Sequence, residues 1–165
     1  MHRVYGPAVA DWFVVNARDA QWFRTELGDW CPFEPEGERF PKLGINLNFL
    51  RPGEPNSMYH GEGQQEDFLV LAGECVLIAD GEERLLRKWD FVHCPPWTEH
   101  VFVGAGEEPC LLLAVGTRGG NGGIRYPANE TAQRYGASVE RDTESPQEAY
   151  SRFSRPERGP APDLP

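Results

Sequence analysis

The feature that most limits the fold of this chain is a rhythm of short apolar runs between residues 42 and 116. The runs are rich in β-branched and apolar residues, and Gly, Pro, Asp and Asn separate them, a pattern typical of strands joined by turns. Eight runs are candidate strands: 45–50, 57–62, 66–71, 75–79, 84–87, 91–94, 100–103 and 110–115. Because eight short strands suit a barrel or a jelly roll, the sequence predicts an all-β fold.

The clearest predicted turn is Asp80-Gly81, which separates two strand-like runs in the segment CVLIADGEERLL. A tight hairpin needs positive φ angles at its two central residues, and Asp-Gly adopts them readily. The sequence therefore predicts a hairpin at this point.

The flanking segments differ from the central one in composition. Residues 1–41 carry many aromatic side chains without a clear period, so we expect an N-terminal aromatic arm that wraps the barrel as extra strands or packs against a second subunit. Residues 117–165 begin with RGGNGG and continue with two proline-initiated segments that predict short helices. The final SRPERGPAPDLP predicts a flexible tail that is extended, disordered or draped on a partner. We therefore expect one domain, with its barrel over residues 42–116.

The charge balance excludes some classes of partner. The 165-residue chain has 16 Lys and Arg against 26 Asp and Glu, a formal net charge of −10, which repels nucleic acid and anionic membranes. No apolar run approaches the roughly 20 residues of a membrane helix, and the first residues lack the apolar core of a signal peptide. These features predict a cytoplasmic protein that binds neither nucleic acid nor membranes.

The four cysteines have no C-x-x-C spacing. In a cytoplasmic chain such residues usually behave as small buried apolar side chains, and we expect this of Cys31, Cys75, Cys94 and Cys110.

A candidate site lies in the segment YHGEGQQEDFLVLAGE. Successive strand side chains point to opposite faces, so His60 and Glu62 share one face. A turn over residues 63–65 would return the chain with Glu66 beside them. On a later strand, His100 shares a face with Phe102 and could complete the cluster. The sequence thus predicts that two imidazoles and two carboxylates converge.

The same segment resembles the first motif of the cupin superfamily, G-x5-H-x-H-x3-4-E-x6-G. His60 matches the first histidine, Glu62 stands in place of the second, and Glu66 and Gly73 follow at the motif spacing; Gly53 precedes with one extra residue. In an alternative register Met58 replaces the first histidine and His60 is the second.

Residues 89–104 resemble the second cupin motif, G-x5-P-x-G-x2-H-x3-N. Pro95 and His100 match its proline and histidine, whereas Trp89, Trp97 and Gly104 stand in place of its two glycines and its asparagine.

The resemblance implies a cupin barrel with one divalent ion, Fe, Mn, Zn or Ni, held by His60, Glu62, Glu66 and His100. The change at Glu62 leaves two possibilities. If Glu62 binds the ion, two carboxylates favour a harder metal. If Glu62 is instead a catalytic acid–base group beside the ion, the other three residues form a two-histidine, one-carboxylate face with open positions for substrate.

The function that the resemblance implies is a metal-dependent enzyme of small-molecule metabolism, of the oxygenase, isomerase or decarboxylase type. The alternative is a non-catalytic binding or storage protein. A metal-free sugar epimerase is disfavoured by two inward glutamates. The predicted substrate-binding residues at the barrel mouth are Met58, Gln64, Trp97 and Phe102. His93 is expected in the barrel wall, outside the site, and the aromatic arm favours a homodimer.

Overall fold

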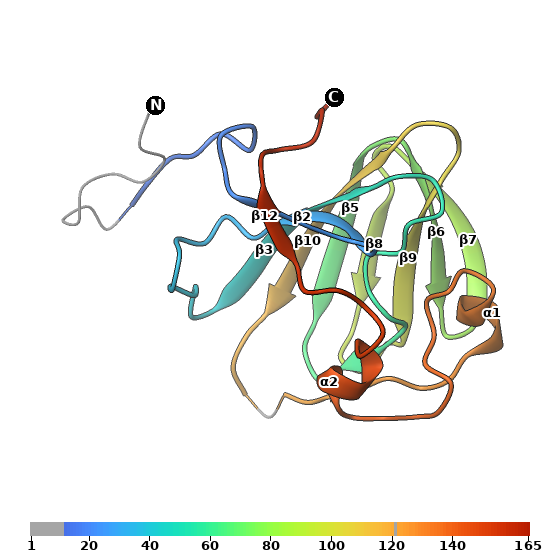
Figure 1. Cartoon of the computed structure of the whole chain (residues 1–165). Coiled ribbons are helices and arrows are strands. Elements are labelled where there is room, and N and C mark those ends of the chain that lie inside the picture. The colour runs from blue at the N-terminus through green and yellow to red at the C-terminus, as the bar shows by residue number, and fades with distance from the viewer. Residues whose placement is uncertain (1–11, 121) are drawn as a thin grey trace.

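The computed structural model describes residues 12–120 and 122–165, and its regular secondary structure consists almost entirely of antiparallel strands (Figure 1). The strands are β1 Trp22–Thr25, β2 Gly28–Cys31, β3 Leu43–Leu50, β4 Gly61–Glu62, β5 Glu66–Ala72, β6 Glu74–Ala79, β7 Glu82–Arg87, β8 Phe91–Cys94, β9 His100–Ala105, β10 Cys110–Thr117, β11 Ile124–Arg125 and β12 Glu157–Gly159. Two short helices, α1 Glu130–Gln133 and α2 Pro146–Ala149, lie in the C-terminal segment. The all-β prediction is confirmed.

Two sheets face each other to form the barrel. A seven-stranded sheet has the order β12-β1-β2-β3-β10-β5-β8, a three-stranded sheet has the order β7-β6-β9, and β11 pairs with β4 in a separate ribbon. The described part of the N-terminal segment supplies β1 and β2 to the large sheet of its own chain. The proline-rich tail is extended and adds β12 to the edge of β1, as Figure 1 shows.

The predicted hairpin at Asp80-Gly81 is confirmed. Asp80 and Gly81 have φ angles of 48° and 80°, and they join β6 to β7 with Ala79 paired to Glu82. These positive φ angles match the type of turn whose twist suits a two-residue hairpin.

The expected strand over residues 57–62 is much shorter than predicted. Its strand bonding is confined to Gly61–Glu62 and an isolated bridge at His60. The backbone N–H of Met58 donates to the Tyr150 hydroxyl, and that of Tyr59 donates to the carbonyl of Ala137. Because the C-terminal segment takes these donors, residues 58 and 59 cannot continue a strand ladder.

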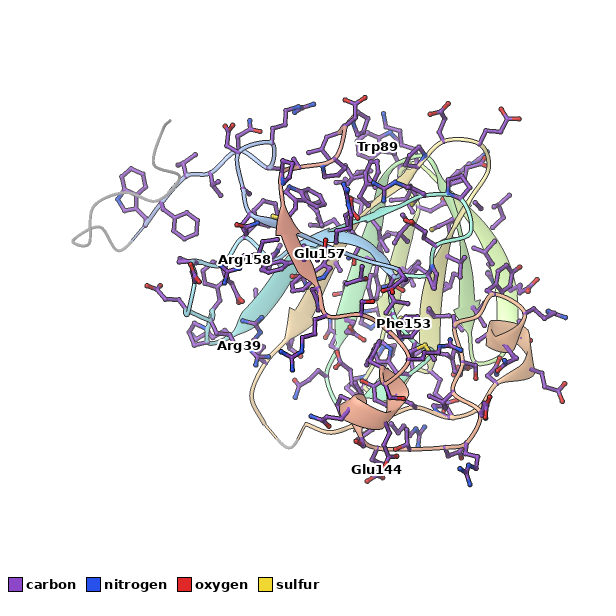
Figure 2. All side chains as sticks on the ribbon, in the orientation of Figure 1. Arg39, Trp89, Glu144, Phe153, Glu157 and Arg158 are labelled. Atoms are coloured by element: carbon purple, nitrogen blue, oxygen red, sulfur yellow. The ribbon has the colours of Figure 1, made fainter. Side chains whose placement is uncertain are left out.

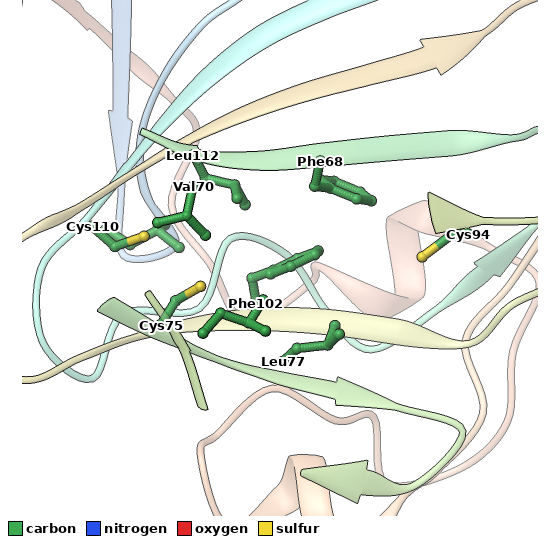
Figure 3. Close-up of a cluster of buried hydrophobic side chains, with 10 residues drawn as sticks. Phe68, Val70, Cys75, Leu77, Cys94, Phe102, Cys110 and Leu112 are labelled. Atoms are coloured by element: carbon green, nitrogen blue, oxygen red, sulfur yellow. The ribbon is translucent and has the colours of Figure 1, made fainter. Parts of the chain in front are cut away.

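The main core fills the space between the two sheets (Figure 3). Phe68, Val70 and Leu112 enter it from the large sheet, and Leu77 and Phe102 enter it from the small one. All four cysteines are buried and free, so the expectation that they are core residues is confirmed. Figure 3 shows the sulfur atoms of Cys75 and Cys110 pointing toward each other.

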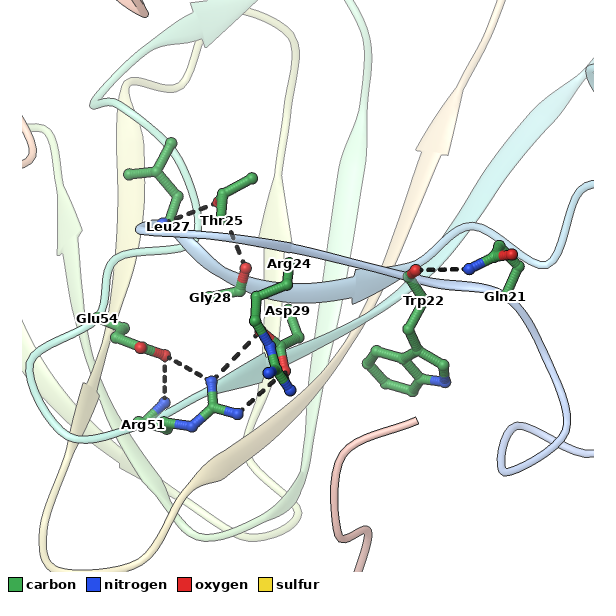
Figure 4. A network of polar contacts seen from close by, with 9 residues as sticks. All are labelled: Gln21, Trp22, Arg24, Thr25, Leu27, Gly28, Asp29, Arg51 and Glu54. Carbon is green, nitrogen blue, oxygen red and sulfur yellow. Dashed lines mark hydrogen bonds and ion pairs between the residues drawn. The ribbon is translucent and has the colours of Figure 1, made fainter. Parts of the chain in front are cut away.

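A buried carboxylate fastens β2 to the loop after β3 (Figure 4). The Asp29 side chain is 2% exposed, and the guanidinium of Arg51 donates to both of its oxygens at 3.1 and 3.3 Å. Arg24 approaches the same carboxylate at 3.4 Å, and Glu54 binds Arg51 from the other side. Charge-assisted contacts of this kind compensate the cost of burying a carboxylate.

Among the described residues, no helix is both long and apolar enough to span a membrane.

Gly73 makes the turn from β5 to β6 at a point where a side chain has no room. Its φ is +68°, and a Cβ there would lie 2.2 Å from the carbonyl oxygen of Pro109. We expect Gly73→Ala to lower the free energy of unfolding by about 1 kcal/mol for the left-handed backbone and by about 1–3 kcal/mol more for the clash. Chemical denaturation measures the change.

Gly53→Ala is the matched control for this substitution. Gly53 has φ +85°, and nothing lies within 4 Å of the position that a Cβ would take, so it carries the backbone cost alone. Equal losses in the two variants would show that the contact with Pro109 does not constrain the turn.

Candidate metal centre

His60 and His100 lie opposite each other on neighbouring backbone segments. The His60 N–H donates to the His100 carbonyl at 3.2 Å, and the His100 N–H donates to the His60 carbonyl at 2.8 Å. Residues that exchange both hydrogen bonds in an antiparallel pair present their side chains on the same face. The two rings are accordingly 5.0 Å apart between centroids.

Each imidazole is oriented by a backbone carbonyl two residues earlier in the chain. Nδ1 of His60 lies 2.7 Å from the carbonyl of Met58, and Nδ1 of His100 lies 2.9 Å from that of Thr98. A carbonyl only accepts, so Nδ1 carries the hydrogen and Nε2 of a neutral ring keeps its lone pair. This is the arrangement that prepares a histidine to bind a metal through Nε2.

Glu66 completes a group of three donors. Its Oε2 lies 3.2 Å from Nε2 of His100 and 4.0 Å from Nε2 of His60, and ligand atoms of the three residues all fall within 4.8 Å of one another. A divalent ion about 2.0–2.2 Å from each nitrogen and oxygen fits between atoms so spaced. The three side chains therefore form a group that could hold a metal ion.

The ionisation of this group follows from burial and mutual contact. Burial lowers the pKa of His60, and the neighbouring His100 lowers it further. For Glu66 burial opposes ionisation, but the hydrogen bond from Nε2 of a protonated His100 and the charges of both imidazoles outweigh it and lower the pKa of Glu66. The same contact raises the pKa of His100. Burial opposes the positive charge of this ring, but the hydrogen bond to Glu66 and the charges of the nearby carboxylates outweigh the burial.

Glu62 lies beside this group on β4 but is not one of the three mutually close donors. Burial raises the pKa of Glu62 to about 8, with the charge of Glu66 and a hydrogen bond to Glu66 as further causes. A hydrogen bond from a protonated Glu62 to an ionised Glu66 explains why the pKa of Glu62 is raised and that of Glu66 is lowered. The structure thus brings the four predicted site residues together and distinguishes Glu62 from the other three.

A cavity of about 370 Å³ opens beside Glu62 and Glu66. The other lining side chains come from the N-terminal segment, β3, the turn between β4 and β5, and the end of β10 with the loop that follows it: Arg39, Asn46, Gln64, Ala114, Val115, Thr117 and Arg118. Sequence reasoning missed Arg39, Asn46 and Arg118. A signal existed for Asn46, because Asn46 and Asn48 alternate with apolar residues in β3 and so mark a polar stripe on one face.

The four predicted substrate-binding residues occupy different surroundings. Gln64 lines the cavity, where its amide donates to the Gly119 carbonyl and accepts from the Thr117 hydroxyl. Trp97 is partly exposed and faces the Arg125 guanidinium. Met58 and Phe102 lie in apolar clusters. Substrate binding by these residues stays a prediction.

His93 lies outside the site. It is half exposed on β8, and its Nδ1 is 2.6 Å from the carboxylate of Asp67 on β5. These residues alternate with the inward-facing Cys94 and Glu66, which places the pair on the outer side of the barrel wall.

The structure shows the backbone conformation at the three positions where the chain departs from the second cupin motif. Trp89 and Trp97, which replace the motif glycines, have φ angles of 76° and 71°, a region that bulky residues occupy only at a cost. Gly104 replaces the asparagine at a point where a Cβ would lie 2.2 Å from the carbonyl oxygen of Arg51. The two tryptophans thus have the positive φ that glycine adopts without strain, whereas the position of Gly104 has no room for an asparagine side chain.

Comparison with protein families finds that residues 49–116 match the family model described as the cupin domain. A comparison with curated proteins finds no match.

Among solved structures, a sugar phosphate isomerase of the cupin superfamily from Silicibacter pomeroyi shares 27% identity with a TM-score of 0.52, covering 66% of each chain. A protein provisionally named as a sugar phosphate isomerase, from Acidithiobacillus ferrooxidans, shares 27% identity with a TM-score of 0.48, covering 53% of this chain and 56% of that one. A variant of salicylate 1,2-dioxygenase from Pseudoaminobacter salicylatoxidans, in complex with gentisate, shares 24% identity with a TM-score of 0.43, covering 48% of this chain and 21% of that one. The chain therefore spans less than two thirds of the length of each of these proteins.

The geometry predicts that His100→Ala weakens binding of a divalent ion by on the order of 100-fold or more, because one of three convergent donors is lost. Elemental analysis of untagged protein and titration with Mn(II) or Zn(II) near pH 7.5 measure this. His93→Ala is the control, since His93 lies on the outer wall, and it should bind metal like the wild type. Equal metal content in all three proteins would contradict the assignment.

Proposed function

The chain belongs to the cupin superfamily, and we propose that it is a divalent-metal-dependent enzyme that acts on a small polar molecule inside the barrel. The observation that carries the proposal is the convergence of Nε2 of His60, Nε2 of His100 and Oε2 of Glu66 beside a cavity. Both imidazoles are held by backbone carbonyls in the tautomer that metal binding requires. The function thus rests on a donor set that fits an ion and on space for substrate next to it.

The donor set fits the metals that bind to two imidazoles and one carboxylate, which include Fe, Mn, Zn and Ni. A bound divalent ion would supply Lewis acidity, polarising a substrate carbonyl or hydroxyl. His60 and His100 would bind as neutral rings, and Glu66 would contribute one negative charge.

Glu62 is the proposed acid–base group. It faces the cavity, lies next to Glu66, and stands outside the three convergent donors. In its ionised form Glu62 can take a proton from one substrate atom, and the protonated carboxyl can then return that proton to another, while Glu66 and the two histidines stay in place as donors. Gln64 shapes the cavity wall, because both ends of its amide are bound to the loop after β10.

The reaction we propose is an isomerisation by proton transfer. The arrangement of Glu62 supports this reaction, and so does the likeness to the Silicibacter pomeroyi sugar phosphate isomerase. Oxygenase and decarboxylase chemistry would use the same ligand face but would not require a proton to move between two substrate carbons.

The proposal predicts different outcomes for the two glutamates. Glu62→Gln should keep its metal and slow turnover by about 10²–10⁴-fold, since it removes the acid–base group and keeps the shape. Glu66→Gln should lose metal, because it removes the carboxylate of the convergent donors. Metal content and exchange of substrate C–H for deuterium, followed by NMR over a panel of aldoses, ketoses and their phosphates, measure both effects.

Three results would count against this function. Metal loss in Glu62→Gln equal to that in Glu66→Gln would make Glu62 a ligand. Metal-dependent oxygen uptake without deuterium exchange would identify an oxygenase. Ligand-dependent melting without any turnover would favour the binding or storage protein.

We also propose that two copies of the chain associate through the region around β8. In the described part of the chain the large sheet ends at β8, and Trp89 and Phe91 there are 66% and 64% exposed. A free strand edge next to exposed aromatic side chains is a surface that natural proteins usually cover.

Phe91→Lys should therefore convert a dimer to a monomer in size-exclusion chromatography with light scattering. The control is Leu85→Lys, an equally exposed apolar residue on β7 of the other sheet, which should remain dimeric. A wild type that is monomeric at micromolar concentration would refute the association.

A further inference from the structure

The cavity beside the metal centre has a cationic side as well as an acidic one. Arg39 and Arg118 line it together with Glu62 and Glu66, and Figure 2 shows Arg39 near the carboxyl-terminal end of β10. The geometry points to an anion subsite at Arg118, which binds a phosphate or carboxylate group of the substrate while the reacting end lies at the metal centre. This inference rests on the proposed function and adds the charge class of the substrate.

The register of the large sheet places two glycines beside Glu66 in one cross-strand row, and the guanidinium of Arg118 lies near the second of them. Gly116 of β10 pairs with Glu66 of β5 on one side and with Gly44 of β3 on the other. Strands are about 4.8 Å apart, so Glu66 and Gly44 are separated by about 10 Å. Because Gly116 and Gly44, on neighbouring strands, have no side chains, this interval is open for a small molecule.

The guanidinium of Arg118 lies over Gly44 at the far end of that row. A Cβ on Gly44 would lie 2.9 Å from Nη2 and 3.2 Å from Nε of Arg118. Any larger residue at this position would displace the guanidinium. The glycine therefore allows a cation to lie against the strand inside the cavity mouth.

Two hydrogen bonds hold the Arg118 guanidinium through one of its nitrogens, Nη1. Nη1 donates to the carboxylate of Glu34 and, at 2.7 Å, to the carbonyl of Phe40. The side chain is 19% exposed, and among residues 12–120 and 122–165 no hydrogen bond is formed by Nε or Nη2. The edge made by these two nitrogens has the fork geometry that binds two oxygens of a phosphate or a carboxylate.

The charges around the cavity favour the same ligand class. Glu34 balances Arg118, and a divalent ion would balance the two charges that Glu62 and Glu66 carry when both are ionised. The exposed Arg39 then leaves the loaded cavity with a net positive charge. A cavity of this charge attracts an anionic substrate, although the chain as a whole is acidic.

A purely structural role for Arg118 makes a different prediction. If Arg118 and Glu34 only clamp the N-terminal segment to the barrel, removing either partner should have the same effect. If Arg118 binds an anion, removing Glu34 leaves the binding nitrogens in place and frees a further donor. Comparing a variant of Arg118 with a variant of Glu34 therefore distinguishes a structural role from anion binding.

The test is calorimetric titration of metal-loaded protein with inorganic phosphate and, separately, with acetate, at constant ionic strength set with chloride. We expect Arg118→Gln to weaken binding of the preferred anion by about 10- to 100-fold, the effect of losing charged hydrogen bonds. Glu34→Gln should bind that anion as well as the wild type or better. The anion that shows this dependence distinguishes a phosphorylated from a carboxylated substrate.

Two more variants keep the test decisive if Arg118→Gln does not fold. Arg118→Lys retains the charge but loses the fork, and Gly44→Ala retains Arg118 but displaces its guanidinium; each should weaken anion binding several-fold. Metal content is measured in every preparation. The subsite would be overturned if anion affinity followed metal content and did not change in Arg118→Lys and Gly44→Ala. If the protein held no metal but still bound the anion through Arg118, the metal function alone would be overturned.

Discussion

The candidate metal centre of this protein depends on the paired backbone hydrogen bonds between His60 and His100. These two bonds connect the segment before β4 to the start of β9, and they place both imidazoles on the same face. The carbonyls of Met58 and Thr98 then fix the ring orientations. The backbone pair and the two carbonyls together direct Nε2 of both rings toward Oε2 of Glu66.

The backbone pair depends in turn on the C-terminal segment. The hydroxyl of Tyr150 binds the N–H of Met58, and the carbonyl of Ala137 binds the N–H of Tyr59. Tyr126 packs between Tyr150 and the His60 ring. Residues beyond the barrel therefore hold the peptide whose carbonyl orients His60, and they contribute to the candidate metal centre without lining its cavity.

The cavity exists because glycine and alanine occupy the strand positions beside Glu66. Gly116 and Gly44 continue the cross-strand row that begins at Glu66, and the next row inward has Ala114 between Phe68 and Asn46. Small residues in both rows keep the space next to Glu66 open, while the apolar core closes it further inside. The polar site and the apolar core thus share the same strands, and side-chain size decides where one ends and the other begins.

The sequence by itself determined the features that depend on neighbouring residues. Alternation and turn residues predicted most strands and the Asp80-Gly81 hairpin, because a pleat and a tight turn are local properties of the chain. The spacing of His60, Glu62, Glu66 and His100 predicted that these side chains converge. Only the tertiary structure decided that Glu62 lies outside the three closest donors, that residues 58 and 59 bond to the C-terminal segment, and that Arg118 stands across two glycines from Glu66. These outcomes depend on strand register and on hydrogen bonds between residues far apart in the chain, which no local pattern encodes.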